Sequence, residues 1–209
     1  HEQNDEMCVH AVASCGDVLK YVKNKTDEVC IKALENEGLA IRYIDKPTAQ
    51  MCLIAVQQNG FALKFIQQQY ELICKTAVFN NPYAIKYVQH KTLELCLLAV
   101  RADGNTLQYM HQPSDLICEE AVKSKAEAIK YIYDPSAYIL KLALKKKPYV
   151  IRYVQECNEG VWLDAIRKNS SVIQFLKNQN EKLIIYAIRQ TPTSIKYLDE
   201  QPDHLSRLA

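Results

Sequence analysis

The stretch from Val29 to Ile66 reads VCIKALENEGLAIRYIDKPTAQMCLIAVQQNGFALKFI, and its second half repeats the pattern of its first half. Cys52 follows Cys30 after 22 residues, and the same step leads from one alanine to the next in nine successive units. These alanines are Ala11, Ala33, Ala55, Ala77, Ala99, Ala121, Ala143, Ala165 and Ala187. Because no insertion or deletion interrupts the period, the sequence predicts a tandem-repeat protein.

The apolar residues within one unit predict two helices. Val29, Cys30, Ala33 and Leu34 follow one another with a spacing that places all four on one face of a helix and on no face of a strand. A second apolar block, Ala40–Ile44, has the same kind of spacing. The sequence therefore predicts an all-α fold, an α-solenoid of about nine 22-residue helix-turn-helix repeats.

The period also predicts where each repeat begins and ends. One array covers residues 1–209, with repeats that start near residues 4, 26, 48, 70, 92, 114, 136, 158 and 180 and a partial repeat at 202–209. Seven repeats place a residue that can cap a helix at this start. These residues are Thr26, Thr48, Thr92, Ser114, Ser136, Asn158 and Asn180. Neither terminal repeat has the polar face of a capping repeat, so we expect a fragment of a longer array.

Glycine or proline stands between the two predicted helices in most repeats. The column consists of Gly16, Gly38, Gly60, Pro82, Gly104, Pro148 and Pro192. We expect glycine here to adopt the left-handed conformation that ends the first helix, and proline to open the second helix. We expect the alanine column to let neighbouring helices approach closely, because a bulkier side chain would push the repeats apart.

Composition and charge exclude several classes of protein. The chain is 48% hydrophobic, which is too much for a disordered segment, and its net charge of +2 gives no strong field towards nucleic acid or anionic membranes. No apolar stretch approaches the length of a membrane span, and the first residues lack a secretory core. We therefore expect no membrane partner and no secretion.

Eight cysteines raise the question of metal binding or disulfides. Six of them, Cys8, Cys30, Cys52, Cys74, Cys96 and Cys118, occupy one column of the repeat. Neighbouring repeats are too far apart for a disulfide within this column, and later repeats replace cysteine with residues that bind no metal. We expect these cysteines to be buried small apolar residues. So many free thiols favour a reducing intracellular compartment such as the cytoplasm.

Basic residues form two columns that would run along a stacked array. The first column, in the second helix, consists of Lys20, Arg42, Lys64, Lys86, Lys130, Arg152 and Lys196. The second column, near the end of the first helix, consists of Arg101, Lys123, Lys145, Arg167 and Arg189. Each column could follow a phosphate backbone. The alternative, which we prefer, is that both columns are solvated faces and that the second one complements the helix dipole.

Aromatic residues form a column directly after the first basic one. They are Tyr21, Tyr43, Phe65, Tyr87, Tyr109, Tyr131, Tyr153, Phe175 and Tyr197. Such rings could stack on bases, but their apolar neighbours favour packing between repeats. The five histidines fall in different columns, and no nucleophile, paired carboxylates or phosphate loop accompanies them. We therefore expect no enzymatic activity, no metal and no cofactor.

One segment resembles a known repeat signature. Residues Ala55–Phe65, AVQQNGFALKF, resemble the pattern A-V-x-x-N-G-x-A-L-x-Y of an uncharacterised family of short helical repeats from giant DNA viruses of amoebae and some bacteria. Residues Asn80–Tyr87, NNPYAIKY, are a close variant, and later repeats replace Asn-Gly with Lys-Pro or Asn-Ser. The resemblance implies a repeat scaffold and a viral source, with the virion as a second possible location. It implies no catalytic residue, since the family has none assigned.

These observations predict a non-enzymatic scaffold that binds protein partners, and the resemblance implies a place within a large viral assembly. Solenoids display long continuous surfaces, which suit this role. The alternative is a nucleic-acid-binding protein that uses the first basic column.

Overall fold

The computed structural model describes residues 4–154, 157–176 and 180–198, and in these residues α-helices alternate with short 3₁₀-helices and no strand is present. The α-helices are α1 (Asp5–Ser14), α2 (Asp27–Asn36), α3 (Ala49–Gln58), α4 (Glu71–Asn80), α5 (Leu93–Ala102), α6 (Asp115–Ser124), α7 (Ala137–Lys146), α8 (Glu159–Lys168) and α9 (Glu181–Gln190). The predicted all-α repeat fold is confirmed. The partial repeat predicted at 202–209 lies outside the described residues.

The second helix of each repeat is a 3₁₀-helix and not the α-helix that helix-turn-helix repeats usually contain. These helices are η1 (Gly16–Tyr21), η2 (Gly38–Tyr43), η3 (Gly60–Phe65), η4 (Pro82–Tyr87), η5 (Gly104–Tyr109), η6 (Ala126–Tyr131), η7 (Pro148–Tyr153), η8 (Ser170–Phe175) and η9 (Pro192–Tyr197). Each has six residues between two extended residues. A segment this short favours the tighter 3₁₀ geometry, which makes its first hydrogen bond after three residues.

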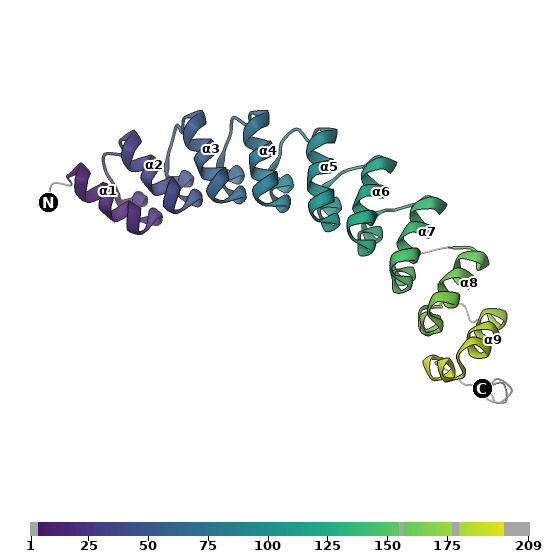
Figure 1. The fold of residues 1–209 in the computed structure, drawn as a ribbon. Helices are drawn as coiled ribbons and strands as arrows, with labels where there is room; N and C mark the ends of the chain where they lie inside the picture. Colours follow the sequence, from purple (N-terminus) through teal and green to yellow (C-terminus); the bar gives the residue numbers. More distant parts are fainter. Residues whose placement is uncertain (1–3, 155–156, 177–179, 199–209) are drawn as a thin grey trace. The chain divides into compact units, whose positions relative to one another are not determined.

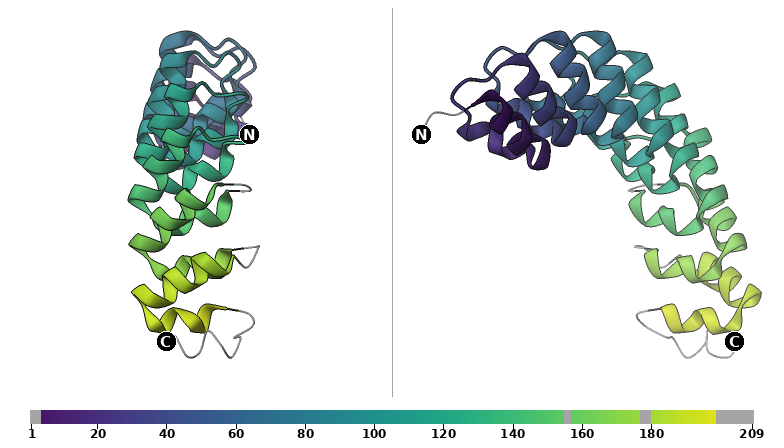
Figure 2. Two further views of the ribbon diagram at one scale, coloured as in Figure 1. Left: turned by 90° about the vertical axis from the view of Figure 1, so that its right-hand side faces the viewer. Right: turned by 60° about the vertical axis from the view of Figure 1, so that its left-hand side comes forward.

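The chain divides into two compact units, His1–Gln112 and Pro113–Ala209. The first unit contains α1 to α5 and the second contains α6 to α9. Within each unit, neighbouring α-helices lie side by side in one layer, and the 3₁₀-helices form a second layer packed against it (Figures 1 and 2). Each unit is therefore a two-layered stack in which sequence neighbours are also neighbours in space.

Capping residues begin most of the α-helices at the expected positions. The N-cap side chain accepts a hydrogen bond from the first turn at Asn4, Thr26, Thr48, Thr92, Ser136, Asn158 and Asn180. Ser114 precedes α6 as predicted, but its side chain makes no capping hydrogen bond, so that expectation was wrong.

The expected left-handed glycines are absent from the described residues, where no glycine has a positive φ. The chain leaves α2 through an extended residue, Glu37, with φ of −140° and ψ of 99°. Gly38 is needed for a different reason, because a Cβ added to it would lie 2.3 Å from the carbonyl oxygen of Ala55 in the next repeat. Gly16 and Gly60 approach the next repeat in the same way, whereas the prolines open η4, η7 and η9 as predicted.

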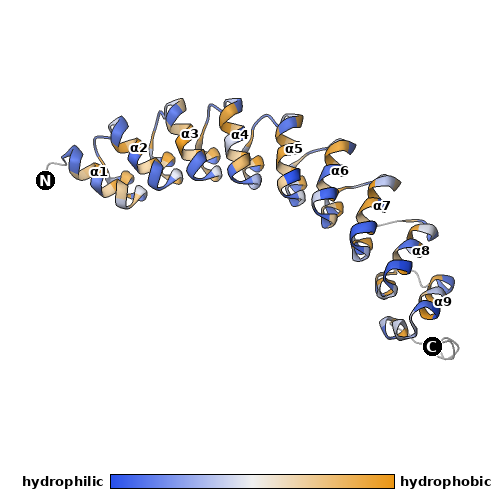
Figure 3. Cartoon of the chain, viewed as in Figure 1, coloured by the Kyte–Doolittle hydropathy of each residue, from blue (hydrophilic) through white to orange (hydrophobic). Residues whose placement is uncertain are grey.

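The core lies between the two layers and between successive repeats. The alanine column has an exposed fraction of 0% from Ala33 to Ala187, and only Ala11 at the start of the first unit is exposed. Apolar residues concentrate along the helices, while the connecting segments are hydrophilic (Figure 3). In the described part of the chain, no helix combines the length and the apolar character that crossing a membrane requires.

Candidate functional site

The first basic column lies on the surface of the 3₁₀-helices. All seven of its residues are exposed, and each cationic group sits over the aromatic ring of the next residue, 4.6–5.4 Å from the ring centroid. Such an arrangement is a cation–π contact. The cations therefore cover ring faces that a stacked base would need.

The aromatic column is part of the packing between repeats. Its rings are half-buried, apart from the exposed Tyr21. Seven of them pack against the cores of the two units: Tyr43, Phe65, Tyr87, Tyr109, Tyr153, Phe175 and Tyr197. Phe61 of one repeat meets Tyr87 of the next edge to face, with 6.1 Å between ring centroids. In the first repeat Asp17 stands at the position of Phe61, and its carboxylate pairs with Arg42 of the next repeat across 2.8 Å. This is the packing role that the sequence favours for the rings.

The second basic column lies in the last turns of α5 to α9, and all of its residues are exposed. Arg101 belongs to the first unit, and Lys123, Lys145, Arg167 and Arg189 belong to the second. Lys123 pairs with Glu119 at 2.8 Å and with Glu120 at 3.0 Å, and these carboxylates raise its pKa. These positions complement the helix dipoles, as expected.

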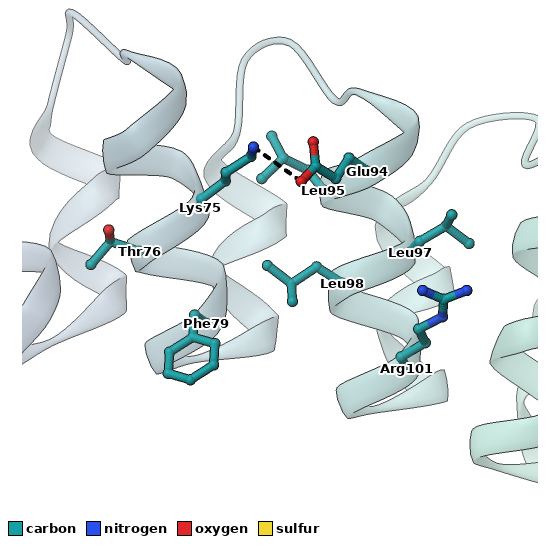
Figure 4. A pocket seen from close by; sticks show the side chains of 8 residues that line it. All are labelled: Lys75, Thr76, Phe79, Glu94, Leu95, Leu97, Leu98 and Arg101. Carbon is teal, nitrogen blue, oxygen red and sulfur yellow. Dashed lines mark ion pairs between the residues drawn. The ribbon is translucent and has the colours of Figure 1, made fainter.

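A groove that the sequence did not predict lies between α4 and α5 of the first unit. It encloses about 500 Å³, and its walls include Phe79 of α4 and Leu95, Leu97 and Leu98 of α5. The side chain of Leu98 points from α5 towards α4 (Figure 4). Four of its eight lining residues have apolar side chains, and apolar atoms supply most of the exposed lining.

Polar residues lie at both ends of this groove. At one end Lys75 of α4 binds Glu71 at 2.9 Å and reaches Glu94 of α5 at 3.0 Å (Figure 4). Arg101 of α5 lines the groove near its other end. Of the predicted site residues in the first unit, Arg101 is the one that this groove includes.

Large apolar side chains stand exposed on the same two helices. Phe79 is 80% exposed, Leu72 is 62% exposed and Leu93 is 54% exposed. Leu72 and Phe79 are two helical turns apart on the same face of α4. One signal in the sequence could have revealed this patch, because Phe79 stands in the column that holds Gln57 and Arg101 in the adjacent repeats.

The cysteine column is buried, as predicted. Its six cysteines are free, and the exposed fraction of each is 7% or less. Burial raises the pKa of the Cys30, Cys52, Cys74, Cys96 and Cys118 thiols. Among the described residues, no group of three or more His, Cys, Asp or Glu side chains has the geometry to hold a metal ion.

No family model, curated protein or solved structure matches the chain.

Proposed function

We propose that this chain is a non-enzymatic scaffold that binds another protein through the groove between α4 and α5. The observation that carries the proposal is Phe79, a large ring that is 80% exposed at the edge of an apolar hollow of about 500 Å³. A contiguous exposed apolar patch with a polar rim is typical of a protein interaction site. Covering Phe79, Leu72 and Leu93 would remove apolar surface from water and so favour association.

The shape of the groove favours an amphipathic helix as the bound segment. The groove lies between two adjacent ten-residue helices, and the exposed apolar side chains of α4 are spaced by two turns. A partner helix presents its own apolar anchors at i, i+3 or i+4, and i+7, which matches this length. The Lys75–Glu94 ion pair at one end would form part of the polar rim.

The repeat signature at Ala55–Phe65 gives a direction for the partner's identity. Its resemblance to repeats of giant DNA viruses supports a partner within a large assembly such as a virus particle. The apolar groove supports a protein rather than a nucleic acid as that partner, because nucleic-acid surfaces demand phosphate-binding cations.

The test is a selection of helical peptides from a displayed library against the full chain. We expect the enriched peptides to share apolar residues at helical spacing, and we expect Phe79→Asp to weaken their binding about tenfold or more, because a charge would enter an apolar contact. Tyr133→Asp is the matched control, since Tyr133 is 96% exposed and lies in the other unit.

Two results would overturn the proposal. One is a set of enriched peptides that binds Phe79→Asp as tightly as the unaltered chain. The other is concentration-dependent self-association of the unaltered chain, measured by sedimentation, that Phe79→Asp abolishes. In that case the groove would bind a second copy of this chain.

A further inference from the structure

A second groove, of about 710 Å³, lies between α7 and α8 of the second unit. The buried Leu144 and the half-buried Val161 and Leu163 form its apolar floor. These two helices pack less closely on each other than the other neighbouring α-helices of this unit. Pro148 occupies the junction after α7, where glycine in the first unit allows close approach. The wide spacing therefore leaves room for a side chain from outside.

Gly160 keeps the mouth of this groove open. It lines the groove in the first turn of α8, and a Cβ added to it would meet only Asn158 Oδ1, at 3.3 Å. The close packing that requires Gly38 in the first unit is absent here. A larger side chain at position 160 would consequently project into the groove instead of displacing a neighbouring repeat.

Four cations surround the apolar floor. Lys141 and Lys145 of α7 and Arg167 and Lys168 of α8 line the groove, together with one carboxylate, Asp164. Asp164 lies 3.8 Å from Arg167, which is a long ion pair. Lys141 and Lys145 make no ion pair with any residue that the structure describes. The rim therefore carries an excess of positive charge.

Lys168 has a structural contact as well. Its Nζ donates to the carbonyl oxygen of Leu144 across 3.4 Å, which links the end of α8 to the end of α7. Lys141 and Lys145 are thus the rim cations that can be altered without removing a contact between the helices.

We propose that this groove binds an acidic peptide segment of a partner protein, with an apolar side chain in the recess and carboxylates against the cationic rim. The cationic rim favours acidic residues in the peptide through charge complementarity. The apolar floor favours an apolar side chain between them, because its burial removes apolar surface from water. A peptide fits better than a nucleic acid because none of the described residues that line the groove is aromatic, and bases bind single-strand sites largely by stacking on aromatic rings. The site is separate from the α4–α5 groove, so it stands or fails independently of the proposed function.

The experiment measures the affinity of the full chain for labelled synthetic peptides by fluorescence anisotropy. The probe is a peptide of about twelve residues with two leucines flanked by glutamates, long enough to cross the groove. We expect the double variant Lys141→Glu/Lys145→Glu to weaken binding about tenfold or more, because like charges would face each other. We expect Gly160→Leu, which changes no charge, to weaken it about fivefold or more by filling the recess.

The matched control is Lys130→Glu/Arg152→Glu, which changes the charge of the same unit equally but lies on the 3₁₀-helices. We expect this control to retain affinity within about threefold, since exposed charges far from the site are screened by salt. Circular dichroism and thermal unfolding establish that each variant is folded.

Three results would overturn the proposal. The first is equal loss of affinity in the control, which would mean general attraction to a basic surface. The second is equal binding of a peptide in which serines replace the leucines. The third is a single-stranded oligonucleotide of the same charge that competes as well as the peptide, which would identify a site for nucleic acid.

Discussion

The backbone N–H of Gly60 donates to Oδ1 of Asn80 in the next repeat across 2.7 Å, and Nδ2 of Asn80 donates back to the carbonyl oxygen of Gln57 across 2.8 Å. The same two-bond amide clamp recurs earlier in the first unit. Its other members are Asn36 with Gly16 and Ala13, and Gln58 with Gly38 and Asn36. Each clamp satisfies two backbone groups at the end of an α-helix and joins one repeat to the next.

Removing one clamp should loosen the stack locally. We expect Asn80→Ala to lower the free energy of unfolding by about 1–3 kcal/mol, because a part-buried N–H and a helix-end carbonyl both lose their partners. Urea unfolding followed by circular dichroism measures this change. The control is Ala102→Asn. Position 102 is the equivalent of position 80 in the next repeat, but the junction that it faces begins with Pro82, which has no N–H to donate. We expect Ala102→Asn to leave the free energy of unfolding nearly unchanged. A gain in this variant as large as the loss in Asn80→Ala would contradict the role of the clamp.

The close approach at the glycine junctions predicts a strong effect of a single added methyl group. A Cβ at position 60 would lie 2.4 Å from the carbonyl oxygen of Ala77, which is backbone and cannot rotate away. We expect Gly60→Ala to cost about 2 kcal/mol or more, measured by thermal and urea unfolding. Gly160→Ala is the matched substitution, with an expected change within about 1 kcal/mol. Equal effects at the two positions would show that helix propensity, not close packing, governs both.

The 22-residue period was sufficient to predict the helices and the core. Alanine, cysteine and aliphatic residues recur at positions that only a helix can bring together, so Ala33 and Cys30 were expected inside and are found there. The same pattern could not distinguish an α-helix from a 3₁₀-helix in a block of six residues, because both bring residues three positions apart to the same face.

The role of glycine and the grooves could not be predicted from one sequence. Gly38 was assigned to a left-handed turn, whereas it is required by the carbonyl of Ala55, a contact that depends on how two repeats stack. The clamp between Gly60 and Asn80 joins residues 20 positions apart that carry no shared motif. Phe79 and Pro148 depart from the usual residues of their columns, but the volumes of the α4–α5 and α7–α8 grooves depend on how far apart the helices lie, and one sequence does not give these distances.

Burial predicts thiols of different reactivity in the folded protein. Cys15 is exposed, Cys157 is half-buried, and the six cysteines of the column are buried. We expect iodoacetamide to modify Cys15 about a hundredfold faster than the column, because a buried thiol reacts only after local opening. Mass spectrometry of peptides after timed quenching measures the rates. Cys15→Ser should remove the fast phase, and rapid modification of Cys52 or Cys74 in the folded chain would be inconsistent with their burial.

The buried thiols also predict a loss of stability at alkaline pH. Burial raises the pKa of five thiols of the column, so these groups remain protonated in the folded state while the unfolded chain ionises near its usual value of about 8.5. The folded state then binds more protons than the unfolded state, and stability falls as pH rises from the unfolded pKa to the raised folded pKa. Below about pH 8 these thiols are protonated in both states, so they add no pH dependence to the free energy of unfolding.

Urea unfolding between about pH 7 and pH 10 measures this slope, which reaches at most about 1.4 kcal/mol per pH unit for each protected thiol. Cys52→Val/Cys74→Val should reduce the slope because two of the groups no longer ionise. An unchanged slope in this variant would assign the alkaline loss to other residues.

The cation–π contacts of the first basic column predict weak binding to nucleic acid. Lys64 and Lys86 sit over Phe65 and Tyr87 at 5.4 Å and 5.2 Å, so the rings are covered. Fluorescence anisotropy with single- and double-stranded DNA and RNA across a salt series measures the affinity and its slope. We expect low affinity with a shallow slope, because few phosphates would be neutralised. Steeply salt-dependent binding that Lys64→Glu/Lys86→Glu/Lys130→Glu abolishes would instead establish this column as a phosphate-binding track.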